Sequence, residues 1–297
     1  MLKNKWFLVL TIVFLSACAP VAPAPITITD GLGQQVVLAE PAKTVVSLAP
    51  SNTEILFALG AGSQVVGRDD FSDFPEQVQQ VRSVGANPYN LEEIVALKPD
   101  LVLLAEINTP ELAAQLKELG LNTYYVKNPT SFEGLYKNIE AIGGLTGHSA
   151  EAKTLNTSLA GRVQVVQENL LSTDVLPVVY YELDASDPAK PWTVGPGTFI
   201  NMVLELAKAK NFTVVSGVSE AYPQISIEQV VLVDPDFILL GDAMWGITVE
   251  SVGQRPGWEK LTAVANNKVF PFDDNLVSRP GPRLVDALEQ LSALLHP

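Results

Sequence analysis

Two glutamates, Glu92 and Glu228, occupy equivalent places in a motif that the chain contains twice. The copies read NLEEIVALKPDLVLLAE at 90–106 and SIEQVVLVDPDFILLGD at 226–242, an offset of 136 positions. A single glutamate in such a place is usually a solvent-facing acid. Two of them at equivalent places predict a symmetric pair of carboxylates, which suits arginines on a partner with two-fold symmetry.

Both copies of the motif begin with the pattern of a helix capping box. Asn90 and Ser226 are expected to accept hydrogen bonds from free helix N–H groups, and Glu93 and Gln229 to reach back to them. The capping pattern does not use the glutamate before each of these partners. That glutamate stands in the first helical turn, where the helix dipole favours a carboxylate. It is therefore left free to contact a partner.

The sequence lacks the usual catalytic and metal-binding motifs. It contains no G-x-S-x-G elbow, no P-loop and no complete G-x-G-x-x-G fingerprint. Loop aspartates form the one candidate acid–base set: Asp30, Asp69, Asp70, Asp73, Asp273 and Asp274. Loop acids in an acidic protein usually face solvent. Bare-ion sites need several histidines, and the only two, His148 and His296, are not expected to share a site. We therefore expect a protein that is not an enzyme and holds no metal ion or cofactor.

The N-terminal residues are predicted to be an export and anchoring segment. Lys3 and Lys5 precede an apolar run of about ten residues, shorter than the roughly 20 that cross a bilayer. The run ends in LSAC, which resembles the bacterial lipobox. Residues 1–17 are therefore predicted to be a signal peptide and Cys18 the lipidated first residue, with 18–25 as a proline-rich tether. The alternative is an ordinary signal peptide followed by a chance cysteine.

Composition restricts the partners of the mature chain. The formal net charge of the full chain is −14 and becomes −16 without Lys3 and Lys5, which argues against nucleic acid, because nucleic-acid binding needs clustered lysines and arginines. No second apolar run has the length of a membrane span. We expect contact with a membrane through the lipid alone.

The remaining sequence alternates short apolar runs with helical patterns, which indicates an α/β fold. Most of these runs are continuously apolar, as in parallel strands that are covered on both faces. The expected strands are Thr44–Leu48, Leu101–Ala105, Thr123–Val126, Val178–Tyr181, Phe237–Leu240 and Val269–Phe272.

A long helical segment divides the chain into two halves. Residues 148–171 carry apolar side chains at helical spacing without a strand, enough for a helix of roughly 35 Å. We interpret this helix as a spacer between an N-terminal lobe, 26–147, and a C-terminal lobe, 172–297. The alternative is that it is simply the last helix of the first half. Each half also contains a strand–turn–helix pattern, at 47–62 and 193–209.

Four stretches together resemble the substrate-binding proteins of type II ABC importers, which carry cobalamin, ferric siderophores and related metal chelates. They read VVSLAPSNTEILFALGAGSQVVG, SDFP, NLEEIVALKPDLVL and YPQISIEQVVLVDPDFIL, in that order. The resemblance covers nearly all of residues 40–297 and is closest to the cobalamin-binding members. It implies a class III periplasmic-binding-protein fold, with two Rossmann-like lobes, mostly parallel central sheets and a long rigid helix joining them.

The resemblance also implies roles for individual residues. Glu92 and Glu228 match the glutamates that dock the two lobes onto arginine pockets of a dimeric permease with its ATPase subunits. Phe71 and Tyr222 fall where cobalamin binders place aromatic rings against the ligand. Loops at the carboxyl ends of the strands should line the cleft. The candidate ligand-binding residues are Pro50, Ser51, Asn52, Phe71, Tyr89, Trp192, Tyr222, Trp245 and Arg279.

The implied function is capture of a metal chelate outside the cytoplasm by a monomer. A corrinoid is the first choice of ligand. A ferric siderophore or haem is the alternative, because the loop VGANPYNLE offers Tyr89 where the cobalamin binders carry a tryptophan. Arg279 could then meet an anionic ligand, whereas Phe74 is expected in the core. The lipid would hold the protein at the outer face of the cytoplasmic membrane, or in the periplasm of a two-membrane cell.

Overall fold

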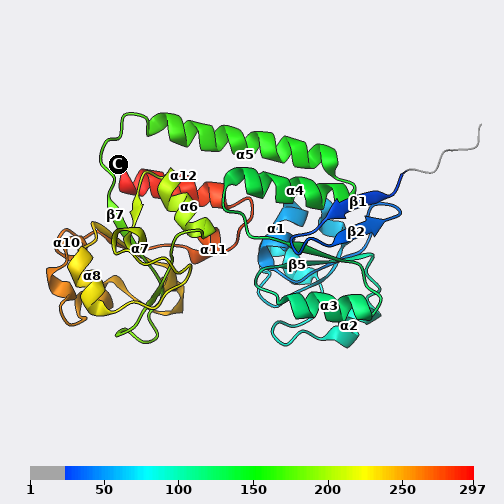
Figure 1. Cartoon of the computed structure of the whole chain (residues 1–297), viewed down its shortest axis with the longest axis horizontal. Helices are drawn as coiled ribbons and strands as arrows, with labels where there is room; N and C mark the ends of the chain where they lie inside the picture. The colour runs from blue at the N-terminus through cyan, green and yellow to red at the C-terminus, as the bar shows by residue number, and fades with distance from the viewer. Residues whose placement is uncertain (1–23) are drawn as a thin grey trace, which may run out of the picture.

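The computed structural model describes residues 24–297 and contains two α/β lobes beside each other (Figure 1). The predicted signal peptide, Cys18 and the tether up to residue 23 lie outside the described residues. In that described part, no helix is both long and apolar enough to cross a membrane.

The N-terminal lobe is built on a four-stranded parallel sheet. Its strand order is β4 (Val65–Arg68), β3 (Val45–Ser47), β5 (Leu101–Ala105) and β6 (Thr123–Val126). Helices α1 (Pro50–Ala58) and α4 (Phe132–Thr146) cover one face, and α2 (Leu91–Ala96) and α3 (Pro110–Glu118) cover the other.

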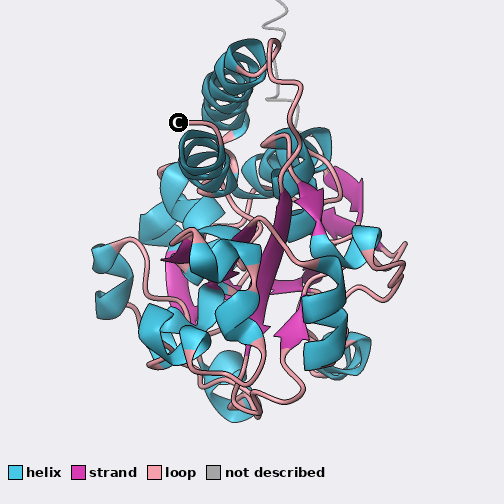
Figure 2. Ribbon diagram, turned by 90° about the vertical axis from the view of Figure 1, so that its left-hand side faces the viewer, coloured by secondary structure: helices cyan, strands magenta, loops and turns pink. Residues whose placement is uncertain are grey.

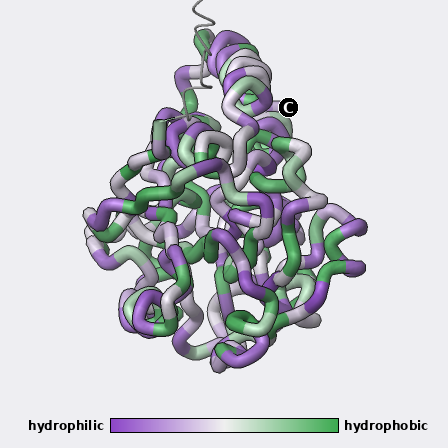
Figure 3. Tube along the Cα trace, turned by 90° about the vertical axis from the view of Figure 1, so that its right-hand side faces the viewer, coloured by the Kyte–Doolittle hydropathy of each residue, from purple (hydrophilic) through white to green (hydrophobic). Residues whose placement is uncertain are grey.

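Alternating side chains of the central strand explain why its sequence is continuously apolar. Leu101 and Leu103 belong to the hydrophobic cluster under α1 and α4, whereas Val102 and Leu104 belong to the cluster under α2 and α3. Successive strand residues point to opposite faces, so a sheet covered on both sides needs apolar residues throughout. Figure 3 shows hydrophobic stretches inside this lobe and hydrophilic loops at its edge.

The C-terminal lobe has a mostly parallel sheet. The order is β11 (Val269–Pro271), β10 (Phe237–Leu240), β7 (Val178–Asp184) and the antiparallel β8 (Trp192–Thr193), while β9 (Lys210–Asn211) pairs in parallel with β7. Helices lie on both sides of this sheet (Figure 2). The fold class predicted from the sequence is thus confirmed.

The other elements lie around these sheets. β1 (Ile26–Thr29) and β2 (Gln35–Leu38) form an antiparallel hairpin, which the sequence analysis did not predict, nor did it predict β4. The remaining helices are α6 (Phe199–Leu206), α7 (Phe212–Val215), α8 (Ile227–Val233), α9 (Val249–Gly253), α10 (Thr262–Ala265), α11 (Asp274–Val277) and α12 (Leu284–Leu295). Short 3₁₀ helices are η1 (Ala61–Gln64), η2 (Glu76–Gln80), η3 (Gly241–Trp245) and η4 (Trp258–Lys260).

The long helix α5 (Ser149–Asn169) lies along both lobes (Figure 1). It packs closely on α4, since a Cβ atom at Gly143 would come within 2.7 Å of the Cβ of Ala152. At the other lobe, Arg162 binds Asp286 and Glu289 of α12 at 2.5 and 2.6 Å. The helix predicted as a spacer therefore contacts both halves of the chain.

Of the two capping boxes predicted in the repeated motif, the structure contains one complete box and one partial box. Ser226 and Gln229 form the complete box at the start of α8. At α2, Asn90 accepts a hydrogen bond from the backbone N–H of Glu93 at 3.0 Å, but the Glu93 carboxylate pairs with Arg82 instead of reaching back. The predicted role of Glu93 as a capping partner is wrong, because a cation is available beside it.

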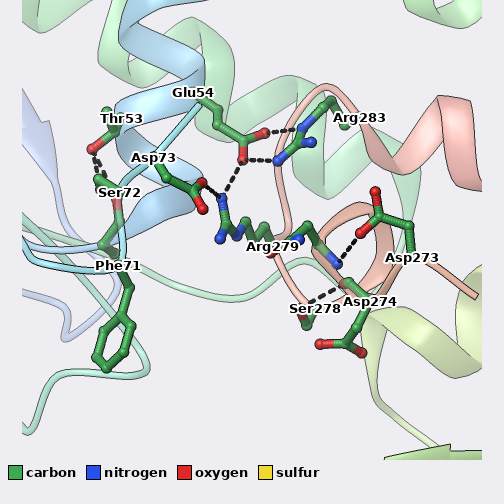
Figure 4. Close-up of polar contacts among 12 residues, drawn as sticks. Thr53, Glu54, Phe71, Ser72, Asp73, Asp273, Asp274, Ser278, Arg279 and Arg283 are labelled. Atoms are coloured by element: carbon green, nitrogen blue, oxygen red, sulfur yellow. Dashed lines mark hydrogen bonds and ion pairs between the residues drawn. The ribbon is translucent and has the colours of Figure 1, made fainter. Parts of the chain in front are cut away.

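Buried ion pairs connect the loop before α12 to the N-terminal lobe (Figure 4). Arg283 donates to both carboxylate oxygens of Glu54 in α1, at 2.9 and 2.5 Å. Arg279 lies 3.5 Å from the same carboxylate and also pairs with Asp73. Glu54 is only 3% exposed, and burial raises its pKa despite the two guanidinium groups.

We expect Arg283→Ala to lower the free energy of unfolding by about 3–5 kcal/mol, because it leaves the buried Glu54 carboxylate without its bidentate partner. Urea denaturation followed by circular dichroism measures the change. The control is Lys43→Ala, which removes a solvent-exposed pair with Glu40 and should leave stability unchanged. A loss no larger than that of the control would contradict the role assigned to the buried pair.

Candidate functional site

A cavity of about 550 Å³ lies between the two lobes. The N-terminal lobe supplies residues that follow its parallel strands: Pro50 and Ser51 after β3, Phe71 after β4, and Glu106 after β5. The C-terminal lobe likewise contributes segments after its strands, with η3 following β10 and α11 following β11. This is the expected place for a ligand in open α/β sheets, at the carboxyl ends of the strands.

Large apolar side chains from both lobes line the cavity with much of their surface uncovered. Phe71 is 60% and Ile107 71% exposed on one side, and Trp245 is 79% exposed on the other. Met244 and Tyr222 stand with Trp245 on the C-terminal lobe. Such side chains normally avoid water, so their clustering at one cavity indicates a surface that a ligand covers.

The structure brings six of the nine candidate ligand-binding residues to this cavity. They are Pro50, Ser51, Phe71, Tyr222, Trp245 and Arg279. The other three do not line it. Asn52 is fully buried and donates to the backbone oxygen of Leu104 at 3.0 Å, because its place in α1 faces the sheet. Trp192 lies in β8, and Tyr89 lies at a second cavity next to the first.

Two further expectations for single residues are wrong. Phe74 is 44% exposed rather than in the core, and the Arg283 guanidinium lies 4.1 Å from its ring centre. Arg279 lines the cavity, but its guanidinium is already paired with Asp73 and lies beside Glu54 (Figure 4). It is therefore not a free cation waiting for an anionic ligand.

The charged groups that line the cavity are mainly acidic. Four carboxylates, those of Asp70, Asp73, Glu106 and Asp274, accompany Arg279, the one cation among the described lining residues. Three other arginines are paired away from the cavity: Arg68 with backbone oxygens, Arg82 with Glu93 and Arg255 with Glu182.

Two of these carboxylates come from opposite lobes and line the cavity together with Tyr222. Burial raises the pKa of Tyr222, and the charges of Glu106 and Asp274 add to this effect. Asp274 accepts a hydrogen bond from Tyr181 at 2.6 Å, and burial raises its pKa. Glu106 and Ile107 were not singled out from the sequence, since no local pattern separates them from ordinary loop residues.

A buried aspartate lies under the segment that carries Met244 and Trp245. Asp242, in η3, accepts a hydrogen bond from the Ala185 N–H at 2.9 Å, while its second carboxylate oxygen is buried without a partner. Burial, with the charge of the neighbouring Glu182, raises the pKa of Asp242 to about 7.

The two glutamates of the repeated motif are exposed, in the first turns of α2 and α8. Both helices lie on the side of the molecule opposite α5 (Figure 1). Hydrogen bonds from its own backbone N–H and from Ser226 hold the pKa of Glu228 below its usual range. The carboxylates are thus available to a partner that faces this side.

No group of three or more histidine, cysteine, aspartate or glutamate side chains in the described residues could hold a metal ion. The lining residues instead offer aromatic faces, hydroxyls and carboxylates. They suit reversible binding of an organic molecule.

Comparison with known proteins identifies the family to which this sequence is similar. The sequence model of a family described as periplasmic binding protein matches residues 45–276. An uncharacterized ABC transporter substrate-binding lipoprotein of Bacillus subtilis is 35% identical over 278 residues, which cover 92% of this chain and 86% of that protein.

Two solved structures resemble the fold. The periplasmic vitamin B12 binding protein of Vibrio cholerae superimposes with a TM-score of 0.73 at 28% identity, covering 86% of this chain and 97% of that one. A possible iron-binding periplasmic solute-binding protein from Staphylococcus epidermidis gives a TM-score of 0.75 at 29% identity, covering 87% and 100%.

We expect Asp242→Asn to raise the free energy of unfolding at pH 8 and to flatten its dependence on pH. An unfolded aspartate has a pKa of about 3.9, so between that pH and about 7 the folded protein binds more protons and loses stability as pH rises. Urea denaturation at pH 5 and pH 8 measures this. The exposed Asp174→Asn is the control and should behave as wild type. An unchanged pH profile in Asp242→Asn would contradict the shift.

Proposed function

This chain belongs to the periplasmic binding proteins, the substrate-binding components of ABC importers, and we propose that it captures a corrinoid such as cobalamin between its lobes. The family consists of solute-binding proteins, so the expectation that the chain is not an enzyme is confirmed. Our proposal concerns the identity of the ligand, the residues that contact it and the residues that dock the protein on its transporter.

The observation that carries the proposal is the pair of apolar walls facing one cavity. Phe71 and Ile107 on one lobe and Tyr222, Met244 and Trp245 on the other leave large faces uncovered. Aromatic faces bury much area with few side-chain rotamers to fix, and they match the flat surface of a macrocycle. The similar vitamin B12 binding protein of Vibrio cholerae supports the choice of a corrinoid.

The acidic lining separates a corrinoid from the alternatives. Corrin rings carry peripheral amides, whose N–H groups can donate to Glu106 and Asp274. Haem carries carboxylates and catecholate siderophores carry negative charge, and both would face like charges in a partly buried cavity. The main alternative is a neutral ferric siderophore. It is favoured by the similarity to a possible iron-binding protein.

The delivery step rests on the exposed glutamates. We propose that Glu92 and Glu228 meet arginines on the two halves of a permease, each pair joined by charge-assisted hydrogen bonds. Cys18 would hold the protein to the membrane through its lipid, as supported by the similar lipoprotein of Bacillus subtilis. ATP hydrolysis by the transporter would then drive release into the cell.

Isothermal titration of the purified protein should show binding of cobalamin and none of haem. We expect the double variant Glu106→Gln, Asp274→Asn to bind cobalamin at least tenfold more weakly, because hydrogen bonds to charged groups contribute about 1.5–3 kcal/mol each. The same variant should gain affinity for haem as the repulsion is removed. Glu118→Gln, an exposed acid away from the cavity, is the control. Tighter binding of haem than of cobalamin by the wild type would refute the proposal.

Reversing the charge of both glutamates, Glu92→Lys with Glu228→Lys, should lower uptake of the ligand by cells at least tenfold, because the docking carboxylates would become like charges. Affinity for the free ligand should stay unchanged. The control pair is Glu133→Lys with Glu151→Lys, exposed acids in the first turns of α4 and α5. Normal uptake by the first pair would rule out the docking role.

A further inference from the structure

A second cavity of about 390 Å³ lies in the N-terminal lobe, beside the main one. Its lining residues come from the loop before α2, from the loop after β5 and from α3. They are Asp69, Phe71, Asn87, Pro88, Tyr89, Leu91, Ile107, Asn108, Thr109, Glu111, Leu112 and Gln115. We call this space the N-lobe compartment.

The N-lobe compartment adjoins the main cavity at two shared side chains. Phe71 and Ile107 line both spaces, and both are largely exposed. A molecule confined to the main cavity would cover only one side of each. One ligand that extends past them into the compartment would cover both sides and bury more apolar surface.

Buried hydrogen bonds hold the floor of the compartment in place. The Tyr89 hydroxyl donates to the Leu48 oxygen at 3.1 Å and accepts from the Asn108 amide at 2.8 Å. Asn108 in turn accepts from the Ala105 N–H at 2.8 Å, and its backbone oxygen accepts from the Tyr125 hydroxyl at 2.7 Å. The floor is therefore formed before any ligand arrives, which lowers the entropic cost of binding.

The walls combine flat apolar surface with neutral polar groups. Pro88, Leu91 and Leu112 supply the apolar part, and Asn87 in the loop and Gln115 on α3 supply exposed amides. Such a lining suits a planar ring with hydrogen-bonding edge atoms.

The charged residues of the compartment restrict which chemical groups it can bind. The described lining holds no lysine, arginine or histidine, whereas Asp69 and Glu111 are acids. Both carboxylate oxygens of Asp69 already accept hydrogen bonds, from Ser72 and from the Phe71 N–H. An anionic group would find no counter-charge there, so the lining favours a group without negative charge.

We propose that the N-lobe compartment binds a planar heterocyclic arm of the same ligand whose body fills the main cavity. This inference rests on the proposed corrinoid function. The main cavity, at about 550 Å³, has the size that drug-sized ligands fill, and a corrin ring that also carries a nucleotide arm is larger than these. The protein therefore selects complete corrinoids over those that lack the heterocyclic base.

Titration of the whole mature protein with cobalamin and with cobinamide, which lacks the nucleotide arm (phosphate, ribose and heterocyclic base), tests the proposal. The wild type should bind cobalamin at least tenfold more tightly. Gln115→Trp fills the compartment and should reduce cobalamin affinity to that of cobinamide, while cobinamide affinity changes less than twofold. Asn87→Trp fills it from the facing loop and should do the same. Ala114→Trp adds an equal ring on the exposed face of α3 and should change neither affinity.

Four other outcomes would overturn the inference. Equal binding of the two corrinoids by the wild type would show that the compartment is not used. So would unchanged cobalamin affinity in both filling variants, or an equal loss of both ligands. Failure of both corrinoids to bind the wild type would refute the proposed ligand itself and the inference with it.

Discussion

One hydrophobic core that continues from lobe to lobe beneath α5 is the constraint on which the rest of the structure depends. The same cluster holds Leu145 of α4, Leu159 of α5 and Leu288 of α12. Interiors packed at this density resist deformation. The buried pair of Glu54 with Arg283 adds a second connection below the helix. The lobes are thus connected by packing and by a buried ion pair rather than by a flexible linker alone.

With the lobes connected in this way, the side chains of the cavity walls determine which ligand can bind. The apolar faces of Phe71 and Trp245 stand exposed on the two sides, because no loop folds over them. The ion pairs that lock the lobes also neutralise Arg279, which leaves the remaining lining acidic. The loop before α12 therefore has two roles. Its arginines connect the lobes, and their pairing also determines the charge of the cavity wall.

Much of the fold could be predicted because it depends on local patterns. β5, β6 and β10 begin and end at the predicted residues, since continuous apolar runs between helices identify buried parallel strands. Strand β4 was missed because VVGR has neither length nor alternation to mark it. In the site, Asn52 was misplaced because a loop-like turn in the sequence, PSN, is the first turn of α1, in which the Asn52 side chain faces the sheet.

The sequence by itself determined the α/β fold class, the two-lobe plan and the two spare glutamates, because hydrophobic periodicity and helix capping act over a few residues. Only the tertiary structure decided that Glu93 binds Arg82, that Arg279 is already neutralised and that Tyr89 faces a compartment of its own. These facts depend on partners that lie elsewhere in the chain, for Arg279 as far as 206 residues away. Charge pairing and cavity shape arise only when such distant segments meet, and no local pattern records them.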